Sequence, residues 1–109
     1  MRILLTGASG TVGQAALHEL KGRHEIVTAG RNSGDLRVDL TDTASIKAMF
    51  EKAGPVDAVI ATAGHVHFGP LQQMTDAQFR MGLDDKLMGQ INLVLIGMAH
   101  VKEIGRAHV

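Results

Sequence analysis

The amino-acid sequence predicts an α/β fold in which the chain builds the first half of a doubly wound parallel sheet. Short apolar runs alternate with segments of helical periodicity, and a glycine-rich turn joins the first apolar run to the first helical segment. The 109 residues suffice for one small domain, and the 45% hydrophobic composition indicates that it is globular. The strand order expected for such a sheet is 3-2-1-4.

The first strand, turn and helix are expected within residues 1–20. Ile3–Leu5 form the apolar run of a buried parallel strand. The apolar residues after the turn fall on one helical face: Val12, Ala16, Leu17 and Leu20. Lys21 suits a helix C-terminus, and Gly22 suits the left-handed residue that ends a helix.

The turn between them carries three regularly spaced glycines. Gly7 permits a sharp turn off the strand, Gly10 permits close approach of a bulky anion, and Gly13 permits close packing of the helix on the strand. The first N–H groups of the helix have no partner within it, so a pyrophosphate can bind there. A flexible loop is the alternative, but the flanking strand and helix favour dinucleotide binding.

The second strand is expected at Glu25–Ala29, and the residues directly after it bear on cofactor choice. An acidic side chain at this place accepts hydrogen bonds from the 2′-hydroxyl of a ribose and repels a 2′-phosphate. Here Gly30 stands where the acid would be and Arg31 is next, and a guanidinium can bind a phosphate through two hydrogen bonds. This arrangement favours NADP over NAD; the alternative is a solvated arginine in a polar turn.

A third short strand is expected at Leu36–Leu40. Thr41 or Asp42 can cap the next helix, at Thr43–Lys52. Gly54 and the proline after it should end that helix. The helix carries apolar residues at helical spacing: Ile46, Met49 and Phe50.

The fourth strand is expected at Val56–Ala61, and it leads into the small residues Ala61–Gly64. Small residues let a backbone pass beneath a cofactor, although a tight turn after a buried strand would also use them. His65 and His67 come next. We do not expect them to bind a metal, because residues two apart need an extended backbone and a third ligand, and no Cys or acidic cluster is nearby in sequence.

Two helices are expected in the last third of the chain. Thr75 and Asp76 should open a short helix with Phe79 and Leu83 turned inward. The longest helical pattern covers Asp84–Lys102. Its apolar stripe indicates a core or interface face: Leu87, Ile91, Val94, Leu95 and Met98.

The turn Thr6-Gly7-x-x-Gly10-x-x-Gly13 resembles the TGxxGxxG cofactor turn of the short-chain dehydrogenase/reductase (SDR) family, and Ala61–Gly64 resembles its NNAG motif. This glycine spacing is typical of the extended and atypical branches, which include epimerases and NADP-binding regulators. The resemblance implies the N-terminal half of a Rossmann-type doubly wound sheet, truncated. The cofactor contacts implied by the resemblance and by the residues themselves are Gly7, Ser9, Gly10, Thr11, Val12, Gly13, Arg31, Asn32, Asp39, Leu40, Ala61, Thr62, Ala63 and Gly64.

The resemblance implies a parent protein that moves hydride between NADP(H) and a small carbonyl or alcohol substrate. The family's Tyr-x-x-x-Lys pair is not within these residues, which contain no Tyr, so we assign no catalytic residue. Lys86 stands where the family has an Asn that holds the proton-relay water, and an ammonium cannot make an amide's donor and acceptor contacts. The alternatives are a non-catalytic NADP-binding regulator or redox sensor, and an NAD-dependent sugar-nucleotide epimerase.

Charge and composition limit the partners. The formal net charge is zero, which gives no indication of a nucleic-acid or membrane partner. The absence of Cys excludes disulfides and thiolate metal sites. No signal peptide is visible, so we expect a cytoplasmic protein. The family resemblance implies a small-molecule substrate and a homo-oligomeric parent.

The end of the sequence resembles an artefact. Glu103–Val109 back-translates as GAG ATC GGA AGA GCA CAC GTC, the start of a widely used sequencing adapter whose next bases form a stop codon. We therefore expect residues 1–102 to be a partial NAD(P)-binding domain and residues 103–109 an adapter scar. A natural helix end capped by Gly105 is the alternative. The fourth strand would then be an unpaired apolar edge, which predicts poor solubility.

Overall fold

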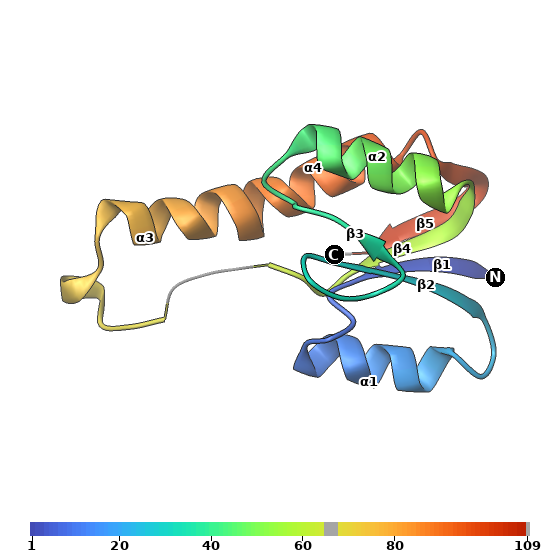
Figure 1. Ribbon diagram of the computed structural model, residues 1–109, viewed down its shortest axis with the longest axis horizontal. Helices are drawn as coiled ribbons and strands as arrows, with labels where there is room; N and C mark the ends of the chain where they lie inside the picture. Colours follow the sequence, from blue (N-terminus) through green and yellow to red (C-terminus); the bar gives the residue numbers. More distant parts are fainter. Residues whose placement is uncertain (65–67, 109) are drawn as a thin grey trace.

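The computed structural model describes residues 1–64 and 68–108. Its centre is an open parallel sheet in the order β3-β2-β1-β4-β5 (Figure 1). The strands are β1 (Arg2–Thr6), β2 (Glu25–Gly30), β3 (Leu36–Arg37), β4 (Val56–Ala61) and β5 (Val101–His108). The predicted order 3-2-1-4 is confirmed, and β5 extends it beyond β4.

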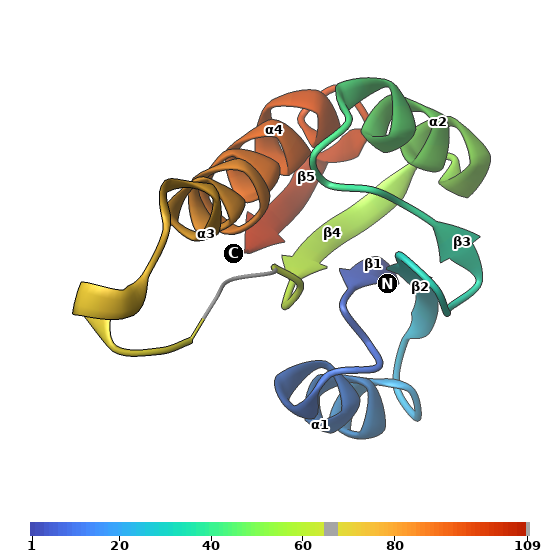
Figure 2. The same ribbon diagram turned by 60° about the vertical axis from the view of Figure 1, so that its left-hand side comes forward.

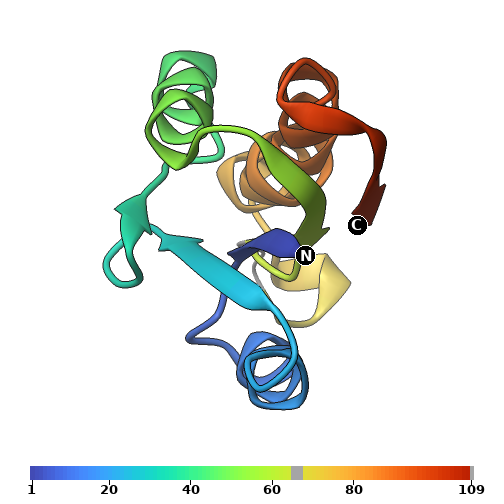
Figure 3. The same ribbon diagram turned by 90° about the vertical axis from the view of Figure 1, so that its right-hand side faces the viewer.

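Helices cover both faces of the sheet. The helix α1 (Thr11–Leu20) lies on one face, and α2 (Thr43–Ala53) and α4 (Met88–Gly97) lie side by side on the other (Figures 1 and 3). The 3₁₀ turn η1 (Leu71–Gln73), α3 (Asp76–Met81) and the π-helical segment η2 (Gly82–Leu87) precede α4. Together α3 and η2 extend the line of α4 past the end of the sheet (Figures 1 and 2). None of the helices in the described part of the chain has the length and apolarity needed to span a bilayer.

The main core lies between the sheet and the α2–α4 layer. Apolar residues of β1 and β4 pack there against α2, and Leu93 of α4 is fully buried among them. Two glycines let α4 approach closely: a Cβ at Gly89 would lie 2.9 Å from the Leu40 Cβ, and one at Gly97 would lie 2.7 Å from the Phe50 ring. This packing fixes η2 and α4 relative to the ends of the strands.

The predicted helix over Asp84–Lys102 is helical only as far as Gly97, where α4 ends. Its first residues are helical as predicted, but they belong to the π-helical η2, which continues directly from α3. After a turn the chain enters β5, so the predicted unpaired edge of β4 is also wrong. The reason is that β4 presents backbone hydrogen-bonding groups that a strand can satisfy and a continued helix cannot. The geometry does not test the origin of residues 103–109, which stays a prediction.

Several smaller expectations also need correction. The third strand ends at Arg37, because the chain then turns to bury two apolar side chains in the core, Val38 and Leu40. Gly22 is not among the described glycines with positive φ, whereas Gly54, at φ +72°, ends α2 as predicted.

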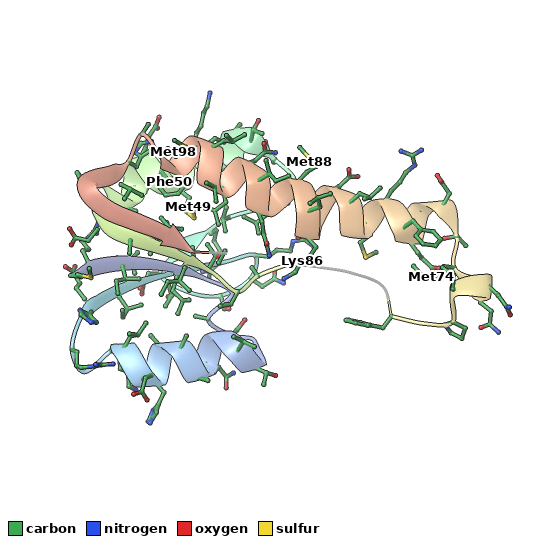
Figure 4. All side chains as sticks on the ribbon, turned by 180° about the vertical axis from the view of Figure 1, so that it is seen from behind. Met49, Phe50, Met74, Lys86, Met88 and Met98 are labelled. Carbon is green, nitrogen blue, oxygen red and sulfur yellow. The ribbon has the colours of Figure 1, made fainter. Side chains whose placement is uncertain are left out.

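The apolar side chains of α3, η2 and α4 are more exposed than predicted. Phe79 and Leu83 are exposed, because α3 and η2 extend beyond the sheet. Most of the predicted apolar stripe is exposed as well: Leu87, Ile91, Leu95 and Met98. The buried face of α4 is instead the one that carries Gly89, Leu93 and Gly97. Figure 4 shows Met88 and Met98 on the side away from the sheet, and Met49 and Phe50 beneath the helices.

Candidate functional site

A cavity of about 420 Å³ opens where β1, β2 and β4 end. In a doubly wound sheet this is the edge at which the crossover connections diverge and ligands bind. The cavity is lined by the glycine turn, the ends of β2 and β4, the segment after β3 and one residue of η2: Gly7, Ser9, Gly10, Gly30, Arg31, Asn32, Val38, Leu40, Thr62, Ala63, Gly64 and Asp85.

The three glycines of the turn differ in whether packing within the protein leaves room for a side chain. Gly7 has φ +81°, and a Cβ there would lie 2.6 Å from the Ala63 backbone nitrogen. A Cβ at Gly13 would overlap the Gly7 carbonyl oxygen and lie 2.6 Å from its carbon. A Cβ at Gly10 would meet, of the atoms the structure describes, only the Gly7 oxygen, at an ordinary 3.5 Å. Packing within the protein therefore requires glycine at positions 7 and 13, whereas Gly10 lines the cavity and has room for a Cβ.

The N-terminus of α1 begins beside the cavity. Gly10 is its N-cap, and no described side chain caps it or carries an acidic group in its first turn. In contrast, Asp42 caps α2, and Thr75 forms a capping box on α3. The first N–H groups of a helix have no partner within it, and the helix dipole favours a negative charge at this end. Among the residues that the structure describes, no side chain caps the start of α1 or places an acidic group in its first turn, so none of these competes there with an anion.

Thr62 joins the loop after β4 to the glycine turn. Its hydroxyl donates hydrogen bonds to the carbonyl oxygens of Thr6 (2.6 Å) and Gly7 (3.2 Å), and its backbone N–H also donates to Thr6 (3.0 Å). On the other side of the loop, Gln90 of α4 donates to the Ala63 carbonyl at 3.4 Å. The threonine thus locks two walls of the cavity together, a role that the sequence pattern of small residues did not indicate.

Arg31 extends from the end of β2 to two carboxylates. Its Nη2 lies 3.5 Å from Asp39 Oδ1 and 3.4 Å from Asp85 Oδ2. The pKa of Asp39 is lowered, first by a hydrogen bond from the Thr41 hydroxyl (2.6 Å), then by one from the Thr41 N–H, and further by the positive charge of Arg31. Arg31 and Asp85 line the cavity, and Asp39 contacts Arg31 from outside its wall.

Lys86 lies against the opposite wall. A Cβ at Gly64 would lie 3.3 Å from the Lys86 Nζ and 3.4 Å from its Cα. In Figure 4 the lysine side chain extends from η2 toward the loop after β4. Lys86, which stands where the family has an Asn, is therefore in contact with the loop after β4 that is predicted to bind the cofactor.

The structure brings most of the predicted contact residues to this one cavity. The predicted residues that line it are Gly7, Ser9, Gly10, Arg31, Asn32, Leu40, Thr62, Ala63 and Gly64. The predicted residues that are not in its wall are Thr11, Val12, Gly13, Asp39 and Ala61. Of these, Gly13 is buried by packing, Val12 is 68% exposed, and Asp39 contacts Arg31 from outside the wall.

Three lining residues were not among the predicted cofactor contacts: Gly30, Val38 and Asp85. No local pattern could have placed Asp85 here, since it lies 54 residues from its partner Arg31. His65 and His67 lie outside the described residues, and the described part of the chain contains no group of His, Asp and Glu residues suited to a metal ion.

Comparison with known proteins agrees with this architecture. The family model described as the RmlD substrate binding domain matches residues 1–81. The protein lin1944 from Listeria innocua is 45% identical, with a TM-score of 0.94 over 98% of this chain and 54% of its own. A small-chain dehydrogenase in complex with NADPH is 23% identical, with a TM-score of 0.86 over 98% of this chain and 48% of its own, and shares the fold.

The short chain dehydrogenase claC of Passalora fulva is 29% identical over 96 residues, which are 84% of this chain and 36% of that protein. The chain thus spans about half the length of the solved chains it matches, and less of this curated relative. The family model covers all four strands of the predicted sheet. Together with these relatives, this match shows that the chain belongs to the short-chain dehydrogenase/reductase family of NAD(P)-binding Rossmann proteins.

Proposed function

We propose that the cavity binds a nicotinamide dinucleotide, NADPH in preference to NADH. We further propose that the protein containing this chain transfers hydride between NADP(H) and a small carbonyl or alcohol. The observation that carries the proposal is Gly10. It is a glycine that protein packing does not require, it lines the cavity, and it caps a helix whose N-terminus has no described side-chain cap. A pyrophosphate that approaches this backbone explains all three features.

The remaining cavity residues fit the rest of the dinucleotide. Arg31 at the end of β2 supplies a guanidinium for a 2′-phosphate, and Val38 and Leu40 supply apolar walls for the adenine. The loop at Thr62–Gly64 passes beneath the cofactor with little side-chain bulk. The bound nicotinamide would supply the hydride chemistry, while these residues bind and orient it. The NADPH complex of a structural relative supports the choice of cofactor.

Lys86 supports a second candidate function, a non-catalytic NADP-binding regulator. Its ammonium lies against Gly64 where the family's amide would hold a water molecule. An ammonium donates hydrogen bonds but accepts none, so it cannot continue a proton relay in the same way. A binder that carries out no turnover has no need of that relay.

Two experiments test the proposal. The first is a fluorescence titration of the 109-residue chain with NADPH and with NADH. Saturable binding with higher affinity for NADPH supports the binding proposal, and the absence of binding to either nucleotide contradicts it. The second is an NADPH-oxidation screen with small carbonyl compounds on the protein that contains this chain. Turnover favours the oxidoreductase, and tight binding without turnover of any compound favours the regulator.

A further inference from the structure

Arg31 and Asp85 contact each other at the proposed adenosine end of the cavity. Arg31 comes directly after β2, whereas Asp85 belongs to η2, and both line the cavity. The Arg31 Nη2 lies 3.4 Å from Asp85 Oδ2, a charge-assisted contact between segments that only the tertiary fold brings together. The residue proposed to bind the 2′-phosphate therefore already has an anionic partner in this structure.

The two carboxylates near Arg31 do not hold it equally. The Asp39 side chain is 47% exposed, so water hydrates its charge. The Asp85 side chain is only 10% exposed. A buried carboxylate loses more hydration than an exposed one, so each contact that compensates its charge is worth more. Asp85 is therefore the stronger competitor for the guanidinium.

A 2′-phosphate that enters this region must compete with Asp85. The guanidinium and the two carboxylates together carry a net negative charge, and a phosphate adds further negative charge to it. To form two parallel hydrogen bonds with the phosphate, the guanidinium must present two of its N–H groups in its fixed planar geometry. A 2′-hydroxyl is neutral and meets neither obstacle.

We propose that Asp85 is a positioning residue that determines cofactor specificity: by holding Arg31 in this ion pair, it competes with the 2′-phosphate of NADP and limits the preference for NADPH over NADH. The proposal rests on the proposed function, in which Arg31 binds that phosphate. It assigns Asp85 an effect on one of the two nucleotides only. A purely structural role would change binding of both.

The test is Asp85→Asn, with Asp84→Asn as the matched control. Both substitutions remove one negative charge from the same turn, but Asp84 is exposed and is not in the cavity wall. We expect D85N to raise NADPH affinity about tenfold and to change NADH affinity less than about threefold, because only the phosphate gains from release of Arg31. We expect D84N to shift the ratio of the two affinities by less than about twofold. A fall in NADPH affinity in D85N, or equal shifts for both nucleotides, overturns the proposal.

A double-mutant cycle with Arg31→Gln separates this proposal from the proposed function. If Arg31 binds the phosphate, R31Q alone lowers the NADPH-to-NADH affinity ratio; if the ratio does not change, the proposed preference for NADPH fails. If R31Q lowers the ratio, the gain from D85N should disappear in the R31Q background, since the competition requires the guanidinium. A gain that persists undiminished overturns only the role of Asp85. Thermal melting checks that each variant is folded, and Asp85→Ser replaces D85N if the asparagine variant is not.

Discussion

Substitutions of two glycines in the same turn should separate binding from folding. In Gly10→Ala the new Cβ meets only the Gly7 oxygen, at 3.5 Å, among the described atoms, and the backbone at φ −79° and ψ 172° suits alanine. Alanine is a poorer N-cap than glycine, by up to about 1 kcal/mol, but it reduces the entropy of the unfolded chain by a similar amount. The free energy of unfolding should therefore change by less than about 1 kcal/mol.

Gly13→Ala should behave in the opposite way. Its Cβ would lie 2.6 Å from the Gly7 carbonyl carbon and 2.9 Å from the Ala8 Cα. These are backbone atoms at the junction of β1 and α1, so relief of the overlap requires a shift of the whole helix. Such overpacking costs about 3 kcal/mol, a large part of the stability of a small domain.

Urea denaturation and NADPH titration measure both effects. We expect G10A to keep the unfolding midpoint of the parent chain and to lose at least about tenfold in NADPH affinity, because the methyl group occupies the place of the pyrophosphate. We expect G13A to unfold at lower urea concentration. Gly22→Ala is the control, since a Cβ there meets nothing within 4 Å among the described atoms. A G10A variant that is folded and binds NADPH with unchanged affinity would refute the assignment of the turn, and G13A stability equal to that of G22A would refute the packing argument.

Three further predictions concern packing, the locked loop and pH. Gly97→Ala places a Cβ 2.7 Å from the Phe50 ring and should lower the free energy of unfolding by about 1–3 kcal/mol in urea denaturation. Thr62→Val removes the hydroxyl that joins the loop after β4 to the glycine turn, and should lower the free energy of unfolding by about 1–2 kcal/mol and weaken NADPH binding in the same titration. Because the pKa of Asp39 is lowered in the folded state, its carboxylate stabilises the fold at neutral pH, and this contribution should be lost as the pH falls below about 4. Thr41→Val should raise the pKa of Asp39 in an NMR titration of the carboxyl group, and an unchanged value would contradict the assigned cause.

Much of the fold could be predicted because its determinants are local. The strand at Val56–Ala61 agrees with the prediction at both ends, since its apolar run comes after a proline and a helix-ending glycine. The glycine turn and the start of α1 could be predicted from residue spacing alone. The family model and the structural relatives support the inferred fold. Each of these features depends on residues within one or two turns of each other, which is the range that a sequence pattern records.

The helix at the end of the chain shows where local patterns fail. Helical periodicity continues through Lys102, yet the chain leaves the helix at Gly97 and pairs with β4. Helical propensity is a weak preference, whereas an unpaired strand edge offers a row of backbone hydrogen bonds. The choice between them depends on a strand that lies far away in the sequence.

The sequence by itself determined the first four strands, their order and the glycine turn, because glycine spacing and apolar periodicity act over short distances. Only the tertiary structure decided which glycines serve packing and which faces the cavity, and that Arg31 meets Asp85, 54 positions further along the chain. These contacts arise where β2 and η2 converge, and their energies depend on burial and distance rather than on neighbouring residues. For that reason the cofactor preference suggested by Arg31 alone has to be judged together with the carboxylates that the fold places beside it.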